Sequence, residues 1–456
     1  MNDVSSKARR PAAYAGYRLR DVPEPDLELA QVGPGTPGGE MMRRYWQPVV
    51  LASELGAVPV RLRILGEDLV AFRDGSGRVG LLHRHCAHRG AGLEFGRIVE
   101  RGIKCCYHGW WFDVDGTLLD APAEPPDSAL RRTACQGAYP VHEAAGLVFA
   151  YLGPPEEQPA FPNYDTLNLP GTDLVPYSIS HPCNWLQVHE NLMDPWHAVF
   201  LHSRMGATQI TAAWGEMPVT EWGEIGDRVY YLTSRRLGDL VWVRFNEVMA
   251  PNVGQVGGFW QDGAREVLFQ RVAATRWTVP NDDASATIFG LRHFSDDVEG
   301  PGGLGDRAKV GKEKLDVYGQ TGGRSLAEMQ DNPGDWEVIV SQRPIAIHAA
   351  EHKGSSDRGV AMLRRQVRRC MRGVAGEGEP LPPLHKPGPD GIVPTWTSNS
   401  VLRVPQRKDL PDQELLLAVG RAVRDAVVAA DGMVGEMRLA AIRANLRKAA
   451  TELAQG

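Results

Sequence analysis

Residues 83–116 read HRHCAHRGAGLEFGRIVERGIKCCYHGWWFDVDG and hold two pairs of side chains that can bind metal. The first pair, Cys86 and His88, has C-x-H spacing. The second pair, Cys105 and His108, has C-x-x-H spacing and follows after sixteen residues. Two cysteines and two histidines can close a tetrahedral zinc site, or they can hold a [2Fe–2S] cluster with both histidines on one iron. The spacing alone leaves these two possibilities open.

The residues that flank the two pairs favour the cluster. Structural zinc sites usually have a C-x₂₋₄-C knuckle, which a C-x-H pair lacks. Two segments resemble the Rieske [2Fe–2S] domain: HRG, which begins at His88, and YHGWWFDVDG, which begins at Tyr107. That family usually reads CPYHGW, whereas Cys106 stands at the proline position here. Since C-x-x-H spacing requires Cys105, the resemblance implies Cys106 as a neighbour and the following cluster ligands: Cys86, His88, Cys105 and His108.

The composition is that of an ordinary globular chain and excludes several function classes. With 456 residues we expect two or three domains. The net charge of −6 gives no basic footprint for nucleic acid. No apolar run approaches the roughly 18 residues of a membrane span, and the first residues lack the apolar core of a signal peptide. We therefore expect a cytoplasmic enzyme that binds neither nucleic acid nor membrane.

Short alternating apolar segments, such as PVRLRIL and DLVAFRD, predict strands around the metal-binding stretch. The part of the chain that follows mixes strand-like segments, mainly in residues 215–295, with helical patterns at 308–375 and 413–453. The predicted divisions are an N-terminal tail and leading segment (1–45), an all-β domain (46–152), a proline-rich linker (153–165) and a larger second domain (166–456).

A second constellation lies in NWLQVHENLMDPWHAVFLH, residues 184–202. Asp194 and His197 are three apart, so a helix places them about one turn apart on one face. His197 and His202 are five apart, which an ideal helix would splay by about 140°. Pro195 removes a helix hydrogen bond and allows distortion there. Two neutral imidazoles and one carboxylate form the facial triad of non-haem Fe(II) oxygenases, with open positions for O₂.

The pattern E-N-x-x-D-x-x-H-x₄-H, about 80 residues after a Rieske motif, resembles the catalytic α subunit of Rieske non-haem iron oxygenases. The likeness covers most of residues 33–375. Three segments are similar to the branch with the phthalate 4,5-dioxygenases and the dehydrodivanillate O-demethylase group: GPGTPGGEMMRRYWQPV, WTVPNDDAS and EHKGSSDRGVAMLRR.

The resemblance assigns roles to the second constellation. It implies that His197 and His202 hold a mononuclear iron. It also implies that Asp194 binds no metal, but hydrogen-bonds His197 and reaches the partner subunit's His108, as a carboxylate that orients a metal ligand. The alternative for Asp194 is a helix cap before the proline that follows it.

The third iron ligand would be a carboxylate far downstream. QDNPGDWEVIVSQRPI, residues 330–345, resembles the family segment that supplies it, which makes Asp335 the predicted ligand. Asp331 and Glu337 are its rivals, although the first suits a helix cap and the second a solvated helix face.

Other residues near these motifs are weaker predictions. Asn191 is expected either beside the iron or as a structural amide. Arg204 could pair with an anionic substrate, but an exposed or ion-paired arginine is the expected outcome. Five aromatic residues are expected in the core rather than in a substrate wall: Trp185, Trp196, Phe200, Trp242 and Phe245.

The resemblance implies an α+β protein, with the all-β Rieske domain followed by a catalytic domain whose antiparallel sheet is flanked by helices. It implies a terminal oxygenase that uses NADH-derived electrons and O₂ to hydroxylate or O-demethylate a small aromatic substrate. The chain shows no G-x-G-x-x-G fingerprint after a strand. A separate NADH-dependent flavin and [2Fe–2S] reductase is therefore expected, as is a homotrimer or a hexamer. The alternatives are a Rieske electron-transfer protein with a non-catalytic second domain and a zinc-stabilised binding protein.

Overall fold

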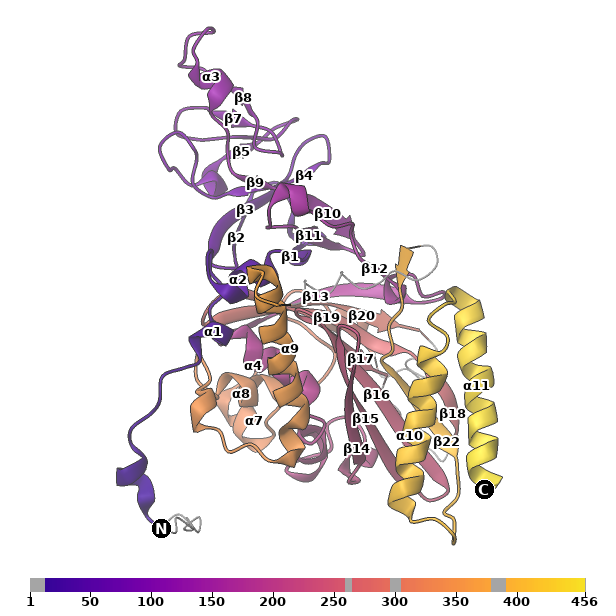
Figure 1. Ribbon diagram of the computed structural model, residues 1–456. Coiled ribbons are helices and arrows are strands. Elements are labelled where there is room, and N and C mark those ends of the chain that lie inside the picture. The colour runs from indigo at the N-terminus through magenta and orange to yellow at the C-terminus, as the bar shows by residue number, and fades with distance from the viewer. Residues whose placement is uncertain (1–12, 259–264, 296–304, 379–390, 456) are drawn as a thin grey trace.

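Two β-rich regions follow one another in the computed structural model, which describes residues 13–258, 265–295, 305–378 and 391–455 (Figure 1). Residues 1–12 of the predicted tail lie outside the described residues. Within the described part of the chain, no helix is long and apolar enough to cross a bilayer.

The first region consists of three small antiparallel sheets. Alternation of exposed and buried residues along its second strand explains why a period of two predicted strands here. The strands are β1 (Gln47–Leu51), β2 (Val60–Ile64), β3 (Glu67–Arg73), β4 (Val79–His83), β5 (Arg97–Ile98), β6 (Ile103–Lys104), β7 (Trp111–Phe112), β8 (Leu118–Asp120), β9 (Ala138–Tyr139), β10 (Val141–Ala144) and β11 (Leu147–Ala150). The sheets have the orders β1-β11-β10, β2-β3-β4-β9 and β5-β6-β7-β8.

The second region is built on a nine-stranded antiparallel sheet. Seven of its strands have the order β13-β20-β19-β17-β16-β15-β14, and the other two are β22, which pairs with β16, and β18, which pairs with β22. All ten residues of β16 are buried, because the sheet is covered on both faces. The strands are β13 (Asp173–His181), β14 (Val219–Ile225), β15 (Arg228–Leu237), β16 (Leu240–Met249), β17 (Val253–Gly257), β18 (Val267–Gln270), β19 (Val272–Asp282), β20 (Ser285–Phe294) and β22 (Ser398–Arg403).

Helices cover the two faces of this large sheet. Figure 1 shows α10 and α11 on one side and α4, α7, α8 and α9 on the other. Leu415, Val419 and Val423 of α10 are fully buried against the sheet, which stabilises this layer through the hydrophobic effect. The helices are α4 (Trp185–Glu190), α5 (His197–Val199), α7 (Leu326–Asp331), α8 (Asp335–Val340), α9 (Arg358–Ala375), α10 (Asp412–Val428) and α11 (Gly435–Gln455).

The leading segment and the short parallel pair of β12 (Asn163–Tyr164) and β21 (Ile392–Val393) join the regions. Helix α1 (Leu27–Ala30) and helix α2 (Pro37–Met42) pack against α9, and α1 also contacts α4. Trp46, Tyr151 and Trp277 belong to one continuous buried cluster that runs from the first region into the second. The predicted α+β fold class, with a β-rich first region and an antiparallel sheet flanked by helices, is confirmed.

Candidate metal centres

Two loops of the first region present the predicted cluster ligands in the same way. In each loop the cysteine N–H donates to the carbonyl five residues later, from Cys86 to Ala91 at 2.9 Å and from Cys105 to Trp110 at 2.8 Å. In each loop the cysteine carbonyl also accepts from a glycine N–H four residues later, at 2.8 Å in the first and 3.1 Å in the second. This local hydrogen bonding fixes the two pairs as equivalent turns.

The four predicted side chains meet between these turns. Cys86 and Cys105 are buried, with their thiols within hydrogen-bond reach of each other. The rings of His88 and His108 are half-buried and lie 4.5 Å apart, centroid to centroid. Nδ1 of His88 is buried and has no hydrogen-bond partner among the described residues, which fits a nitrogen that binds a metal. Cys106 is exposed, unlike Cys86 and Cys105.

The arrangement fits a binuclear cluster better than a single zinc ion. A tetrahedral zinc would draw all four ligand atoms to one point. Among the described residues, however, only one group of three ligand atoms lies within 4.8 Å, and it lies elsewhere in the chain. The four side chains here divide into a thiol pair and an imidazole pair, as two bridged irons require.

The Gln136 side chain stabilises the first turn, and no sequence pattern indicated this role. Its Oε1 accepts from the Ala87 N–H at 2.7 Å, and its Nε2 donates to the carbonyls of His83 and His85 at 2.7 and 3.0 Å. No local motif marks Gln136, since it lies about fifty residues downstream of the turn.

The histidine pair of the second region lies on a distorted helix. After α5, residues Phe200–Arg204 form a π-helical segment, with a bond of 2.8 Å from Met205 N–H to Phe200 carbonyl. A π segment widens the turn and is frequent at functional sites. It brings His202 back to the side of His197, so that their rings lie 5.3 Å apart instead of splayed.

Asp335 completes this group from a distant segment. Its Oδ1 lies 3.6 Å from His197 Nε2 and 3.2 Å from His202 Nε2. One ligand atom from each of these three residues lies within 4.8 Å of the others. Asp335 opens α8, where a close approach of Gly319 to Gly334 fixes the backbone, because a Cβ on either would collide with the other. Two imidazoles and one carboxylate are the donor set of a non-haem ferrous site.

Electrostatics keep Asp335 in its metal-binding form. Burial alone would raise the pKa of this carboxyl group, but the neighbouring His202 and His197 and a hydrogen bond from Gln320 lower it below its usual range. The Gln320 amide donates to Asp335 Oδ2 at 2.5 Å, and the Asn191 amide donates to Oδ1 at 3.3 Å. Asn191 therefore lies beside the ligand group, and Gln320 is a neighbour that sequence patterns did not indicate.

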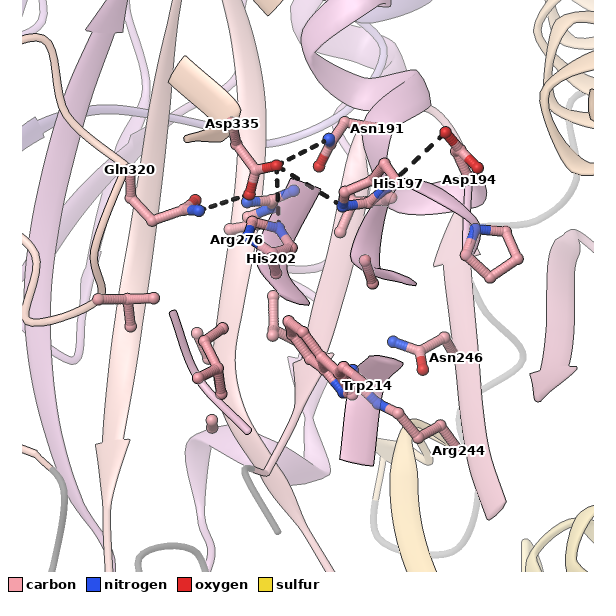
Figure 2. A pocket seen from close by; sticks show the side chains of 18 of the residues that line it. Asn191, Asp194, His197, His202, Trp214, Arg244, Asn246, Arg276, Gln320 and Asp335 are labelled. Carbon is pink, nitrogen blue, oxygen red and sulfur yellow. Dashed lines mark hydrogen bonds and ion pairs between the residues drawn. The ribbon is translucent and has the colours of Figure 1, made fainter. Parts of the chain in front are cut away.

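Asp194 divides its two oxygens between two roles (Figure 2). Oδ1 accepts from the Trp196 N–H at 2.9 Å, which is the capping role considered as an alternative. Oδ2 faces His197 Nδ1 at 3.8 Å, too far for a hydrogen bond. The side chain of Asp194 is 39% exposed, so this oxygen is open to a further partner.

Several weaker predictions fall outside this site. Asp331 ends α7 and is exposed, and Glu337 accepts from the Gly334 N–H at 2.7 Å and pairs with Arg324. Arg204 is exposed and donates to a backbone carbonyl, so it does not line the cavity described below. The prediction that Phe200 belongs to the core is wrong, because its side chain is 44% exposed on the widened turn.

A cavity of about 100 Å³ opens beside the three predicted iron ligands (Figure 2). Trp214 lies against His202, with ring centroids 5.3 Å apart, and the Arg244 guanidinium lies over the other side of the indole at 4.9 Å. Arg235 and Arg276 also line this cavity. All three arginines are buried, and burial lowers the pKa of each guanidinium, that of Arg235 to about 9.

Comparisons with known proteins agree with this geometry. Residues 45–140 match the family model of the Rieske [2Fe-2S] domain. The chain is 49% identical over 421 residues to the oxygenase subunit of tert-butanol monooxygenase / tert-amyl alcohol desaturase from Aquincola tertiaricarbonis, covering 87% of each chain. It is 37% identical to the phenoxybenzoate dioxygenase subunit alpha from Ectopseudomonas oleovorans, over 81% of this chain and 90% of that one. Dicamba monooxygenase bound to 3,6-dichlorosalicylic acid shares the fold, with a TM-score of 0.53 and 20% identity over 73% of this chain and 98% of that chain.

These relatives are oxygenase subunits, and the chain covers most of their length. The predictions of a terminal oxygenase, of a [2Fe–2S] cluster and of a mononuclear iron are therefore confirmed, and the reading as an electron-transfer protein with an idle second domain is not favoured. Oxygenase subunits of this kind work with a separate reductase on small substrates. The chain belongs to the Rieske non-haem iron oxygenases, as their catalytic α subunit.

Proposed function

We propose that this chain oxygenates a small aromatic substrate that carries a carboxylate, by hydroxylation or by O-demethylation. The observation that carries the proposal is the buried arginine pair in the cavity of the ligand group. The assignments within it are the following: Cys86, His88, Cys105 and His108 as cluster ligands in a domain of residues 46–152; His197, His202 and Asp335 as iron ligands in a domain of residues 166–456; and residues 1–45 and 153–165 as leading segment and linker.

Arg235 and Arg244 support a negatively charged substrate. Both guanidinium groups are buried, and among the described residues no ion pair is formed by either with a carboxylate. Burial lowers the pKa of both groups, and the nearby charge of Arg244 lowers that of Arg235 further. An unpaired buried charge costs several kcal/mol, so such a pair favours an anionic partner. Arg235 is held by the Glu216 carbonyl and the Thr233 hydroxyl, while Nε of Arg244 has no hydrogen-bond partner in the part of the chain that the structure describes. Arg244 is therefore the group we assign to the carboxylate.

Arg244 and the three predicted metal ligands line the same cavity. The Trp214 ring lies between His202 and Arg244, so a substrate held by Arg244 extends along the indole toward the ligand group. When bound there, a ferrous ion supplies the activation of O₂ at its open positions. The residues of the chain orient the substrate and exclude water from the reacting carbon. The relative that acts on phenoxybenzoate supports an aromatic acid.

A tertiary alcohol is a second candidate substrate. It is favoured by the 49% identity to the oxygenase subunit of the tert-butanol monooxygenase. Asn246 lines the same cavity, and its buried Oδ1 has no partner, so it can accept a hydrogen bond from a hydroxyl group.

The proposed electron route passes from the cluster of one subunit to the iron of the next. Within one chain the loops near β5 and β7 lie far from α4 and α8 (Figure 1). Asp194 and His197 line both the substrate cavity and a second cavity on the side of α9. We therefore assign Asp194 as the contact for the partner subunit's His108, which implies a homotrimer or a hexamer. The proposed electron donor is an NADH-dependent flavin and [2Fe–2S] reductase in the cytoplasm.

The test is O₂ uptake with product mass analysis, using a surrogate reductase and a panel of benzoates, methoxybenzoates, neutral aryl methyl ethers and tert-butanol. We expect Arg244→Met to raise KM for the carboxylates about 10- to 100-fold, the worth of a charged hydrogen bond, and to leave neutral substrates unchanged. The matched control is Arg236→Met on the neighbouring strand β15, because Arg236 pairs with Asp412 outside the cavity. Turnover of tert-butanol but of no carboxylate would replace the proposal by the second candidate.

A further inference from the structure

The Gln209 side chain contacts His202 on the side away from the metal-ligand group. Its Oε1 lies 2.7 Å from His202 Nδ1. An amide oxygen only accepts hydrogen bonds, so Nδ1 carries the hydrogen and Nε2 keeps its lone pair. That Nε2 is the atom 3.2 Å from Asp335 Oδ1. The contact with Gln209 therefore selects the form of His202 that can bind a metal.

The other end of the same amide contacts the segment that leads into Asp335. Nε2 of Gln209 donates to the Pro333 carbonyl at 2.7 Å and to the Leu201 carbonyl at 3.1 Å, with Asn332 Oδ1 at 3.3 Å. All three partners are acceptors, so the orientation of the amide follows from its surroundings. Pro333 lies two residues before Asp335 and far from Gln209 in sequence.

The backbone strengthens this connection. The Gln209 N–H donates to the His202 carbonyl at 3.0 Å, which closes the turn after the π-helical segment. His197 has no comparable support, because its Nδ1 has no hydrogen-bond partner and its nearest carboxylate, Asp194, is 3.8 Å away. The ring of His202 is thus fixed by a hydrogen bond with the chain, whereas the ring of His197 is not fixed in this way.

We propose that Gln209 is a positioning residue that holds His202 and the Asp335 segment in register and thereby sets the affinity of the site for iron. This inference rests on the proposed ligand set of His197, His202 and Asp335. Groups that orient metal-bound histidines typically contribute a factor of about 10 to 100 in metal affinity. Gln209 contacts two of the three ligand-bearing segments, so its loss affects both.

The experiment measures metal binding and needs no turnover. A chelator first removes the mononuclear iron from the full-length protein, and Co(II) is then titrated while its ligand-field absorption is followed. We expect Gln209→Leu to raise the Kd for Co(II) about 10- to 100-fold and to change the absorption bands, since His202 can then rotate. Gln209→Glu keeps an oxygen that accepts from His202 but loses the amide that donates to the Pro333 and Leu201 carbonyls, so we expect a Kd between those of the wild type and of Gln209→Leu.

The matched control is Gln366→Leu. Gln366 is a buried glutamine of α9 whose amide donates to the Asp227 carbonyl, so its loss costs a similar hydrogen bond away from the site. Its Co(II) bands and Kd should equal those of the wild type. Equal Kd values in Gln209→Leu and Gln366→Leu would overturn the role of Gln209. Equally weak binding in Gln209→Glu and Gln209→Leu would overturn the part of that role that rests on the contact with His202. Failure of the wild-type protein to bind Co(II) after chelation would instead overturn the ligand set itself.

Discussion

The cluster loops and the mononuclear site assemble their side chains by different means. The cluster side chains lie within residues 86–108 and are set by two equivalent turns whose hydrogen bonds are local. The mononuclear group combines a distorted helix at His197 and His202 with the start of α8 at Asp335, and only the packing of the second region brings them together. A site of the first kind is visible in spacing, whereas a site of the second kind depends on the fold.

The largest expected effect separates the two centres completely. Asp335→Ala removes the carboxylate of the proposed ligand group, so we expect loss of the mononuclear iron and a fall in oxygenation of about 1000-fold or more. The cluster should remain, as measured by visible absorption and by low-temperature EPR of the reduced protein. Asp331→Ala is the control, because Asp331 is exposed at the end of α7 and should leave both centres intact. Retention of iron in Asp335→Ala would return the assignment to the rival carboxylates.

The converse experiment removes the cluster and keeps the iron. Cys105→Ser should abolish the cluster absorption and EPR signal, since Cys105 is buried beside Cys86. Cys106→Ser should retain both signals, because the Cys106 side chain is exposed. Iron at the mononuclear site, measured by metal analysis, should be unchanged in both variants. A cluster lost in Cys106→Ser and kept in Cys105→Ser would reverse the ligand assignment.

A smaller effect tests the contact between the centres. Asp194→Asn keeps the oxygen that caps the Trp196 N–H but removes the charge that faces His197. We expect turnover to fall about 100-fold while both metal centres stay bound. The check is reduction of the cluster followed by product yield in a single turnover. Wild-type turnover in this variant would rule out Asp194 as part of the electron route.

The smallest expected effect concerns the stability of the first region. Glu67 of β3 is 14% exposed and accepts hydrogen bonds of 2.6 Å from Arg43 and from the Tyr139 hydroxyl. Burial alone would raise its pKa, but contacts with His83, Tyr139 and Arg43 lower the pKa of Glu67 to about 2. Because the folded-state pKa lies below the unfolded value of 4.5, this stabilisation is complete above pH 4.5 and is lost as pH falls toward 2.

We therefore expect Glu67→Gln to lower the free energy of unfolding by about 1–2 kcal/mol at pH 7 and by much less near pH 2. Denaturant unfolding, followed by loss of the cluster absorption, measures this difference. Glu143→Gln is the control, since Glu143 makes a more exposed ion pair with Arg73. A pH-independent loss of stability would show that packing, rather than charge, is the contribution of Glu67.

The sequence could predict the cluster ligands and the strands around them because both depend on short-range patterns. It could also point to His197 and His202, but their spacing disagreed with an ideal helix, and only the π-helical segment explains how they meet. Asp335 was found by family resemblance, since no local spacing relates it to the histidines.

Other residues of the second site could not be predicted, for physical reasons. Arg244 lies on the central strand β16 and lines the cavity. Which face of that strand meets the cavity depends on how the sheet packs, and the local sequence does not show it. Gln209 and Gln320 act through contacts with residues far away in sequence or in other loops. Arg204 stands near His202 in sequence, but it is exposed and donates to the Gly215 carbonyl, which is the expected exposed outcome.

One feature of the sheet bears on how the protein is made. Residues Leu240–Phe245 of β16 pair with β22, so that Arg244 lies opposite Asn399. A growing chain emerges from the ribosome with its N-terminal part first. This part of β16 pairs with β15 on one side, but its other edge stays open until β22 has been synthesised. An open edge is a site that another chain can join, so the last wall of the catalytic pocket closes only when the C-terminal part of the chain is available.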